Sequence, residues 1–462
     1  MTPGYIERKD GLQKVGSLAD LELPADWSLR RLRHIGDISP SNVDKKENDD
    51  ETSVSLCNYT DVYYNDTISS EVGFMNSTAT KSQVERFSLK SGDILLTKDS
   101  ESWDDIGIPA FVPNDFPGVL CGYHLFLIRP DQEQVDPKYL NWTLASRALA
   151  FQFEQSAQGV TRYGLTTEDM SNILVPIPPL KVQQKISSFI VRQVGKIDTL
   201  IQKKEGLVEA LDEKREATIS QLVAEGLDPN LNLKPSNVDW ADKIPAGWEI
   251  IRLKWLTTKI GSGKTPKGGE EAYVEEGVIF LRSQNVHFDG LRLDDVAYID
   301  EETNAEMEST QVEPKDVLLN ITGASLGRCS LVPGEFLQAN VNQHVCILRP
   351  QPDRINPSFL NYVISSNSVQ HQIFADQEGA SREAVTFSQI EDFQIPVPPL
   401  DTQEAIADYL DQETARIDRL KAKLNSSIGL LKEKRESLIT RAILGKIRLD
   451  NQSWSDQQEV TS

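Results

Sequence analysis

The sequence predicts a tandem repeat in which globular α/β (α+β) domains alternate with long helices. Three observations predict this fold class. The second half of the 462-residue chain repeats the first half at an offset of about 220 residues. The first part of each copy alternates short β-branched runs with turn residues. Each copy ends in a proline-free stretch whose apolar residues recur every three or four positions.

The repeat is visible in matching strings of residues. VPIPPL ends at Leu180 and IPVPPL ends at Leu400, and the string EKRE occurs at 213–216 and again at 433–436. A gapless alignment of 129–220 with 349–440 gives roughly 26 identities in 92 positions, far above chance. A period of this length indicates two large copies and excludes a solenoid of short repeats.

The globular part of each copy is predicted to be a mixed domain, over 24–180 and over 245–400. Strands are expected in SVSLCNYT, DILLTKD and GYHLFLIRP of the first copy, and in GVIFLRSQNV, DVLLNITG and QHVCILRP of the second. Helical patterns follow at 137–155 and 357–374.

Two long helices are predicted over 181–228 and 401–449. About 45 residues at a rise of 1.5 Å each give a rod of roughly 65–70 Å. A single such helix would leave its apolar stripe in water, so we expect the two helices to bury their stripes together as a coiled coil. An antiparallel pairing would relate the two domains by a pseudo-twofold axis. Sequence does not fix helix direction, and the alternative is that each helix packs only on its own domain.

The remaining segments are expected to be an N-terminal leader (1–23), a linker (229–244) and a polar tail (450–462). The first residues, MTPGYIERKDGLQ, lack the apolar core of a signal peptide. No apolar run approaches the roughly 18 residues of a membrane span. The four cysteines form no C-x-x-C pair, which favours buried, reduced thiols in a cytoplasmic protein.

The net charge of −22 is a poor overall signature for a nucleic-acid binder. Residues 1–180 hold 16 basic and 27 acidic residues (net −11), and residues 229–400 hold 14 and 24 (net −10). The predicted helices are nearly neutral. A DNA-binding domain in this chain would therefore need a local basic patch, with its acidic side facing away from DNA.

Two motifs resemble catalytic signatures only in part. The segment from Thr258 to Thr265 resembles the phosphate-binding G-x-x-x-x-G-K-[ST] loop, but Thr258 replaces the first glycine and Pro266 follows where a helix should begin. A flexible loop is the favoured interpretation, and a DNA-contacting loop is the functional alternative. The PIPPL and PVPPL strings lack the polar residue that precedes P-P in amino methyltransferases. We therefore expect no catalytic site and no metal site in the chain.

Several predicted loops carry side chains able to read base edges. Arg suits guanine, and Asn or Gln suits adenine, because each can form two hydrogen bonds in the major groove. The candidates in the first copy are Asn58, Tyr59, Thr97, Lys98, Arg162 and Tyr163, with Tyr123 and His124 in a further loop. Those in the second copy are Lys264, Arg282, Gln284, Asn285, Asn320, Thr322, Ser325, Arg328, Asn342, Gln343, Ser381 and Arg382.

For any one of these residues an ordinary polar turn is the stronger interpretation. Arg162 and Arg382 stand out because the repeat preserves both in a G-x-x-R loop. An arginine held for packing or for a salt bridge would leave the same pattern.

Together these features resemble the DNA-specificity subunit of type I restriction–modification systems. The resemblance covers nearly the whole chain. Its carriers are KIPAGWEIIRLKWL, the GSGKTPKGG segment before GVIFLRSQNV, KDVLLNITGASLG, and the ending IPVPPLDTQEAIADYLD with its long helix, which occurs in two copies. The first copy departs from the pattern because it lacks a GSGKTP segment.

The resemblance implies two target-recognition domains held apart by two antiparallel helices. Each domain would read one half of a bipartite target in double-stranded DNA, and the helices would set the gap and dock two modification (methyltransferase) subunits. No cofactor is expected in this chain. S-adenosylmethionine, ATP and Mg²⁺ are expected on the modification subunits and on restriction/translocase subunits that can join them. Differences between the two copies imply an asymmetric target.

Two other functions remain open on the sequence alone. A DNA-modifying enzyme would bind a methyl donor by itself, and the missing donor and P-P-Y motifs argue against it. A coiled-coil scaffold that binds only protein is permitted by the repeat and the helices. A DNA footprint with two protected blocks would exclude the scaffold.

Overall fold

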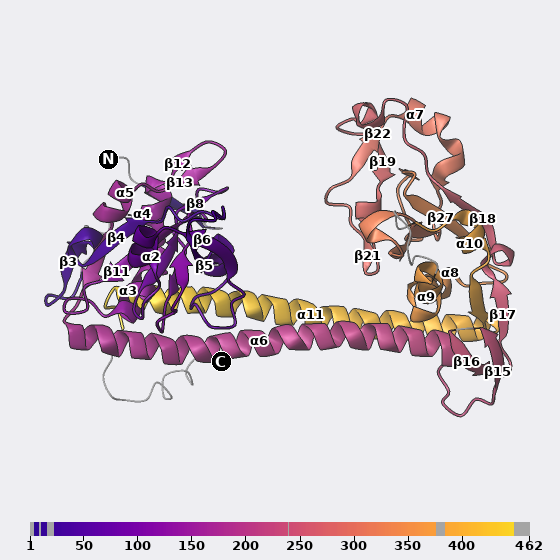
Figure 1. The fold of residues 1–462 in the computed structure, drawn as a ribbon. Coiled ribbons are helices and arrows are strands. Elements are labelled where there is room, and N and C mark those ends of the chain that lie inside the picture. The colour runs from indigo at the N-terminus through magenta and orange to yellow at the C-terminus, as the bar shows by residue number, and fades with distance from the viewer. Residues whose placement is uncertain (1–3, 9–10, 16–22, 239, 376–383, 448–462) are drawn as a thin grey trace. The chain divides into compact units, whose positions relative to one another are not determined.

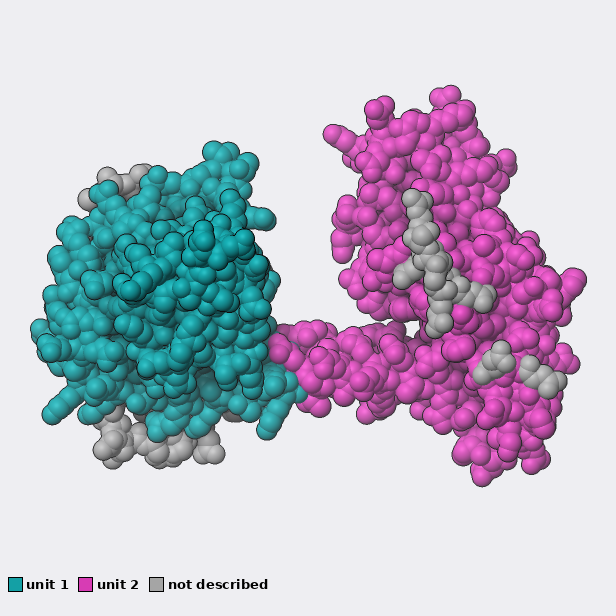
Figure 2. Space-filling view, viewed as in Figure 1, with its two compact units in different colours: residues 1–204, 426–462 teal, residues 205–425 magenta. Residues whose placement is uncertain are grey.

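A computed structural model describes residues 4–8, 11–15, 23–238, 240–375 and 384–447. The chain divides into two compact units, residues 1–204 with 426–462 and residues 205–425, coloured teal and magenta in Figure 2. Each unit contains one globular domain and part of both long helices. The mixed α/β content and the two long helices predicted from the sequence are confirmed.

Domain 1, in the first unit, is built on two small sheets. A four-stranded antiparallel sheet has the order β4-β11-β7-β9, and a three-stranded sheet has the order β10-β5-β6 with β10 parallel to β5. The strands are β3 Ser28–Arg31, β4 Gly36–Pro40, β5 Thr52–Cys57, β6 Met75–Ala79, β7 Ile94–Thr97, β8 Asp99–Ser100, β9 Pro109–Phe111, β10 Val119–Cys121, β11 Leu125–Pro130, β12 Gln158–Gly159, β13 Tyr163–Gly164 and β14 Leu174–Ile177. The helices are α1 Tyr59–Tyr63, α2 Lys81–Phe87, α3 Pro137–Leu144, α4 Arg147–Ser156 and α5 Thr167–Asn172.

Domain 2, in the second unit, repeats this arrangement with longer connections. Its sheets have the orders β18-β27-β24-β25 and β22-β19-β26-β23, and β19 is parallel to β26 as β5 is to β10. The strands are β17 Glu249–Arg252, β18 Thr257–Ser262, β19 Val278–Leu281, β20 Val286–His287, β21 Gly290–Leu291, β22 Ala297–Ile299, β23 Gln311–Val312, β24 Val317–Asn320, β25 Cys329–Leu331, β26 Ala339–Val341, β27 Val345–Pro350 and β28 Gln394–Val397. The helices are α7 Glu301–Glu306, α8 Pro357–Ser365, α9 Asn367–Phe374 and α10 Phe387–Glu391.

Two hairpins precede the domains. Strands β1 (Gly4–Arg8) and β2 (Gly11–Val15) pair in the first unit, and β15 (Leu233–Val238) pairs with β16 (Ala241–Pro245) in the second. The segment expected as a linker, 229–244, therefore contains most of an antiparallel hairpin.

The long helices are α6 (Leu180–Glu225) and α11 (Leu400–Ile443), visible in Figure 1. Each begins directly after two prolines, which separate it from the preceding strand, β14 or β28. Within the first unit, Ile186 and Ile190 near the start of α6 share a core with Ile439 and Ile443 at the end of α11. The helices are therefore antiparallel.

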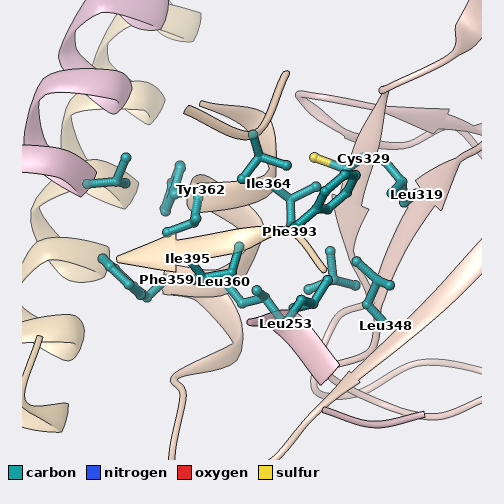
Figure 3. Close-up of a cluster of buried hydrophobic side chains, with 14 of the residues drawn as sticks. Leu253, Leu319, Cys329, Leu348, Phe359, Leu360, Tyr362, Ile364, Phe393 and Ile395 are labelled. Atoms are coloured by element: carbon teal, nitrogen blue, oxygen red, sulfur yellow. The ribbon is translucent and has the colours of Figure 1, made fainter. Parts of the chain in front are cut away.

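The second unit uses the opposite ends of the two helices. In the second unit, Ile406 and Leu410 of α11 and Ile219 and Val223 of α6 join the core of domain 2. Figure 3 shows this core, in which Phe359, Leu360 and Tyr362 of α8 lie between the helices and the sheet. Burial of each such side chain contributes about 1.5–3 kcal/mol.

Ion pairs between the two helices also occur in each unit, with the roles of α6 and α11 reversed. In the first unit Arg435 of α11 donates to Asp198 of α6 at 3.0 Å, and in the second Arg215 of α6 donates to Asp418 of α11 at 2.6 Å. Each pair joins the arginine of one copy's EKRE string to the aspartate of the other copy. The repeat preserves both partners, and the antiparallel register of the two helices brings them together.

Candidate nucleic-acid interface

The G-x-x-R loop of domain 1 forms a tight hairpin between β12 and β13. Gly159 pairs with Tyr163, and Tyr163 pairs with Ser100 of β8. Gly159 has φ +150°, and a Cβ there would lie 1.9 Å from the carbonyl oxygen of Arg162. Only glycine fits, so the first residue of the motif allows the turn that places Arg162 beside β8.

Arg162 belongs to a cluster of three residues, here named the His124 cluster (Asp99, His124 and Arg162). Arg162 Nη2 donates to Asp99 Oδ1 at 2.5 Å, and His124 Nδ1 lies 2.9 Å from Asp99 Oδ2. The side chain of Asp99 is 15% exposed and that of Arg162 is 58% exposed. The carboxylate thus anchors a guanidinium that remains accessible to a ligand, with most of its donors unused.

Lys98 adds a second cation next to this cluster. Its Nζ donates to the carbonyl oxygen of Tyr123 at 2.8 Å and lies 4.4 Å from the centroid of the Tyr123 ring. Burial lowers the pKa of Lys98. Tyr123 is 48% exposed, so the pair presents an aromatic ring backed by a positive charge.

Tyrosines of α1 lie in the same region. The rings of Tyr59 and Tyr63 stack with centroids 5.5 Å apart, and Tyr64, 77% exposed, meets Tyr63 edge-on. Tyr63 donates to Asp105 at 2.6 Å, and this hydrogen bond raises the pKa of Tyr63 to about 12. Electrostatic interactions link Tyr59 to Asp99 and Arg162. Domain 1 therefore gathers Asn58, Tyr59, Lys98, Arg162 and Tyr163 of the predicted residues.

Domain 2 has a corresponding group, here named the His344 cluster (Thr265, Thr322, Gln343 and His344). Thr322 Oγ1 lies 2.6 Å from His344 Nδ1, Gln343 Nε2 lies 2.9 Å from His344 Nε2, and Thr265 donates to Gln343 Oε1 at 2.8 Å. The backbone bridge between Thr322 and Ala384 corresponds to the pairing of Asp99 with Gly164 in domain 1. The cluster thus occupies the same place in the fold as the His124 cluster.

The two clusters differ in charge although their backbones correspond. The position of Asp99 in domain 1 holds Thr322 in domain 2, and the position of Tyr123 holds Gln343. Ser381 and Arg382, predicted in the G-x-x-R loop of domain 2, lie outside the described residues.

Other predicted residues of domain 2 lie around Asp295 and in the turn between β24 and β25. Gln284 Nε2 donates to Asp295 Oδ2 at 2.9 Å, and Arg282 Nη2 lies 3.7 Å from Asp295 Oδ1. Ser325 and Arg328 are half-buried in the turn after β24, where the Arg328 amide donates to the Ser325 carbonyl at 3.1 Å.

Four predicted residues are buried and support the loops. Thr97 accepts from the Ile108 amide at 2.9 Å, Asn320 donates to the Ser283 carbonyl at 2.8 Å, and Asn342 accepts from the His344 amide at 3.1 Å. Asn285 donates at 2.9 Å to the carbonyl oxygens of Arg292 and Asp295, beyond the β20–β21 hairpin. Asparagine and threonine serve turns as readily as they read bases, which sequence alone does not separate.

The glycine and the turn of the loop that resembles a phosphate-binding loop have a structural explanation other than phosphate binding. A Cβ on Gly263 would lie 1.8 Å from the Val341 carbonyl oxygen, so close backbone approach explains the glycine. The residues after Lys264 form a short 3-10 turn, Gly269–Ala272, in place of the α-helix that a phosphate site requires. The exposed Lys264 donates to Ser309 Oγ at 3.2 Å.

The residues that sequence reasoning missed are Asp99, Thr265, Tyr63 and Tyr64. Asp99 follows the predicted Lys98 directly, but an acid is not expected at a surface facing DNA. The run Tyr59-Thr-Asp-Val-Tyr63-Tyr64 was a usable signal, because aromatic residues at helical spacing and next to a cation suit base stacking.

The part of the chain that the structure describes holds neither a candidate metal site nor a candidate membrane-spanning helix. No group of three or more His, Cys, Asp or Glu side chains there could hold a metal ion. No described helix is both long and apolar enough to cross a membrane.

A family model described as the type I restriction modification DNA specificity domain matches the chain twice, over residues 24–210 and 245–429. The two matches start at the two domains and end within the two long helices, so they coincide with the two copies of the repeat.

Individual relatives are similar over long stretches. A protein of Methanocaldococcus jannaschii, assigned as the specificity subunit of the type I restriction enzyme MjaX, is 24% identical over 432 residues, 93% of this chain and 95% of that protein. The type I restriction enzyme EcoKI specificity subunit of Escherichia coli is 23% identical over 223 residues, 48% of this chain and 47% of that protein.

One solved structure shares the fold. A chain from work on the complex assembly and conformational transition of the type I R-M system superposes with a TM-score of 0.70 at 18% identity, covering 92% of this chain and all (100%) of its own length.

Proposed function

Because this chain belongs to the type I restriction modification DNA specificity family, we propose that it selects the target of a type I restriction–modification complex through two different half-sites. The chain is a DNA-specificity subunit with two recognition domains. Domain 1 would read one half through the His124 cluster, Lys98 and the tyrosines of α1. Domain 2 would read the other half through the His344 cluster, Lys264, Arg282 and Gln284.

The observation that best supports this proposal is the placement of unlike side chains at one location in two matching domains. The backbone pairing of Asp99 with Gly164 recurs as the bridge between Thr322 and Ala384. Because the frame is common and the exposed groups differ, the two domains would present different donor and acceptor patterns to DNA. An asymmetric bipartite target follows.

Phosphate contacts would come mainly from partner subunits. Residues 1–180 carry a net charge of −11, so the domain itself gains little from counterion release on DNA binding. Two readers joined by a stiff connection raise each other's effective concentration, so neither needs high affinity. We expect the salt dependence of DNA binding to be shallow for the chain alone and steeper for the assembled complex.

The long helices offer one surface in each unit for a partner. Leu200 of α6 in the first unit is 48% exposed, and Leu420 of α11 in the second unit, at the matching repeat position, is 42% exposed. The same apolar side chain is thus presented once per unit, which suits two copies of one modification subunit. We propose that these subunits dock there and carry the S-adenosylmethionine, while ATP and Mg²⁺ belong to the restriction/translocase subunits.

A charge at either leucine tests this docking. Leu200→Glu and Leu420→Glu should each remove one modification subunit, and the double variant should lose methylation in the complex while its DNA footprint persists. Gln202→Glu, at an exposed position two residues along α6, is the matched control because it faces another side of the helix. Full methylation in the double variant would place the docking surface elsewhere.

The experiment that tests the function is methylation-sensitive sequencing of genomic DNA from cells with and without this gene, with an active modification partner present. Loss of one split, asymmetric adenine-methylated motif is the expected result, and it gives both half-sites and the gap. An unchanged methylome with an active partner would instead favour a protein-binding scaffold.

A further inference from the structure

Domain 1 contains a cavity of about 140 Å³ beside the His124 cluster. Drug-sized ligands occupy pockets of roughly 300–1,000 Å³, so this cavity suits a single small planar group. Its walls include Tyr59, Tyr123 and His124, which are aromatic, and Asn58, Lys45 and Asp44, which are polar.

The walls combine the two kinds of contact that a nucleobase needs. Aromatic rings stack on base faces, and such stacking is worth roughly tenfold or more in affinity per base. Asn58 can offer both a donor and an acceptor to a base edge, and Lys45 can approach the adjoining phosphate. The Lys98 ammonium lies over the Tyr123 ring, so this wall of the cavity is backed by a positive charge.

The cavity also opens on the surface that would face DNA. His124 is shared between the cavity and the His124 cluster, whose Arg162 is more than half exposed. The Cys57 carbonyl accepts from the Gly122 amide at 2.9 Å, and a Cβ on Gly122 would lie 2.9 Å from that oxygen. This glycine therefore lets the Asn58 and Tyr123 walls approach each other closely.

Among the described residues of domain 2, the positions of the two wall tyrosines hold no aromatic residue, although His344 corresponds to His124. The parallel pairing of Cys57 with Cys121 recurs as that of Leu281 with Val341, which aligns Tyr59 with Ser283 and Tyr123 with Gln343. Stacking on this scale is thus a property of domain 1.

We propose that the cavity of domain 1 binds one unstacked base of the half-site that this domain reads, and that domain 2 reads its half-site with all bases stacked. This proposal rests on the proposed function, because it assigns the means by which one recognition domain holds its DNA. No covalent step is involved, and the base returns to the duplex when the complex dissociates.

The test uses the full chain without modification subunits, so that no other subunit can extrude a base. Duplexes carrying the mapped target receive one mismatch at a time, each made by changing the partner of the base under study. Mispairing lowers the cost of removing a base from the stack, so a protein that captures this base binds the mismatched duplex more tightly. We expect one position in the domain 1 half-site to tighten binding by about tenfold and none in the other half-site to do so.

Two cavity variants and one control complete the test. Tyr59→Leu and Tyr123→Leu should each abolish the tightening at that position, while Trp103→Leu, which changes an exposed ring outside the cavity walls, should preserve it. Retained protection of the domain 2 half-site shows that the variants are folded.

The outcomes separate this proposal from the proposed function. Specific two-block protection without any tightening mismatch, or tightening that persists in both cavity variants, overturns the cavity proposal and leaves the specificity role standing. Absence of specific protection on the intact target, for the chain and for the complex, overturns both.

Discussion

Gln183, in the first turn of α6, joins domain 1 to the long helix, and replacing it by leucine should destabilise the first unit. The side chain is fully buried. Its Oε1 accepts from the Asp136 amide at 2.7 Å, and its Nε2 donates to the carbonyl oxygens of Pro178 at 2.8 Å and Gln134 at 3.1 Å. Leucine has a similar volume and fills the space without making these bonds.

The expected loss follows from the groups left without a partner. The variant removes the partner of one amide, that of Asp136, and of two carbonyls, those of Pro178 and Gln134, and each such loss in a buried place costs about 1–3 kcal/mol. The added apolar contact offsets part of this, so we expect a net loss of about 2–6 kcal/mol. Against a typical total of about 5–15 kcal/mol for a domain, such a loss is measurable in any unfolding experiment.

Hydrogen exchange read by mass spectrometry resolves the two units and is therefore the appropriate assay. Gln183→Leu should lower the opening free energy of peptides from domain 1 and spare those from domain 2. Gln403→Leu should do the reverse, because Gln403 accepts from the Asn356 amide at 2.8 Å and donates to the Pro398 carbonyl at 2.8 Å in the second unit. The exposed neighbour Gln184, changed to leucine, is the control and should stay within about 0.5 kcal/mol. A loss below about 1 kcal/mol for both buried glutamines would refute this account.

Four further outcomes are expected. Arg349→Met leaves the buried Asp316 carboxylate without its ion-pair partner and should cost the second unit about 3–5 kcal/mol in urea unfolding, whereas a neutral result would mean that the carboxylate protonates or finds water. Arg162→Ala should weaken protection of the domain 1 half-site by about 1–3 kcal/mol in footprint titrations, and equal loss at both half-sites would count against direct reading. Seven residues inserted in both long helices add about 10 Å and should lengthen the unread gap by about 3 base pairs in the methylome, so an unchanged gap would end the proposal that the helices set it. The Lys214 ammonium holds the pKa of Glu413 below its usual 4.5. The carboxylate therefore stabilises the fold above that pH and loses this contribution as the pH falls through the lowered pKa. The loss of stability caused by Glu413→Gln should vanish at low pH, and a loss that does not change with pH would show that the pair contributes nothing.

The sequence was sufficient for the fold because the same pattern occurs in two copies. Apolar residues at helical spacing predict both rods, and the buried strands β7, β11, β24 and β27 lie in the runs expected from their composition. Helix direction required the structure, since an amphipathic stripe pairs in either sense. The breaks between α3 and α4 and between α8 and α9 also required it. The buried hydroxyls of Ser146 and Ser366 bond to carbonyls three residues earlier and end each first helix.

The candidate site could be predicted only in part. Residues next to strand ends, such as Lys98 and Tyr59, gather as expected because several strands end at one edge of the domain. The asparagines behave differently: Asn285 donates to the Arg292 carbonyl and Asn320 to the Ser283 carbonyl, so both are buried and support loops of their own domain. Asp99 could not be anticipated, because its value lies in anchoring Arg162 across 63 residues of chain, a pairing that no local pattern encodes.

The arginines that the repeat preserves can now be separated by their partners. Arg129 and Arg349 each donate to a buried aspartate, Asp93 and Asp316, and the repeat preserves the acid together with the base. Both partners of these pairs are needed for the fold, which is sufficient reason to keep them.

Arg162 follows a different logic. Its acid, Asp99, is replaced by Thr322 at the matching position, yet the second copy still has an arginine, Arg382, in its G-x-x-R loop. If the arginine served only to pair with that acid, the second copy would have no reason to keep it. The repeat therefore preserves the arginine without the acid, and in domain 1 the Arg162 side chain is 58% exposed. Both observations favour the proposal that this arginine contacts DNA.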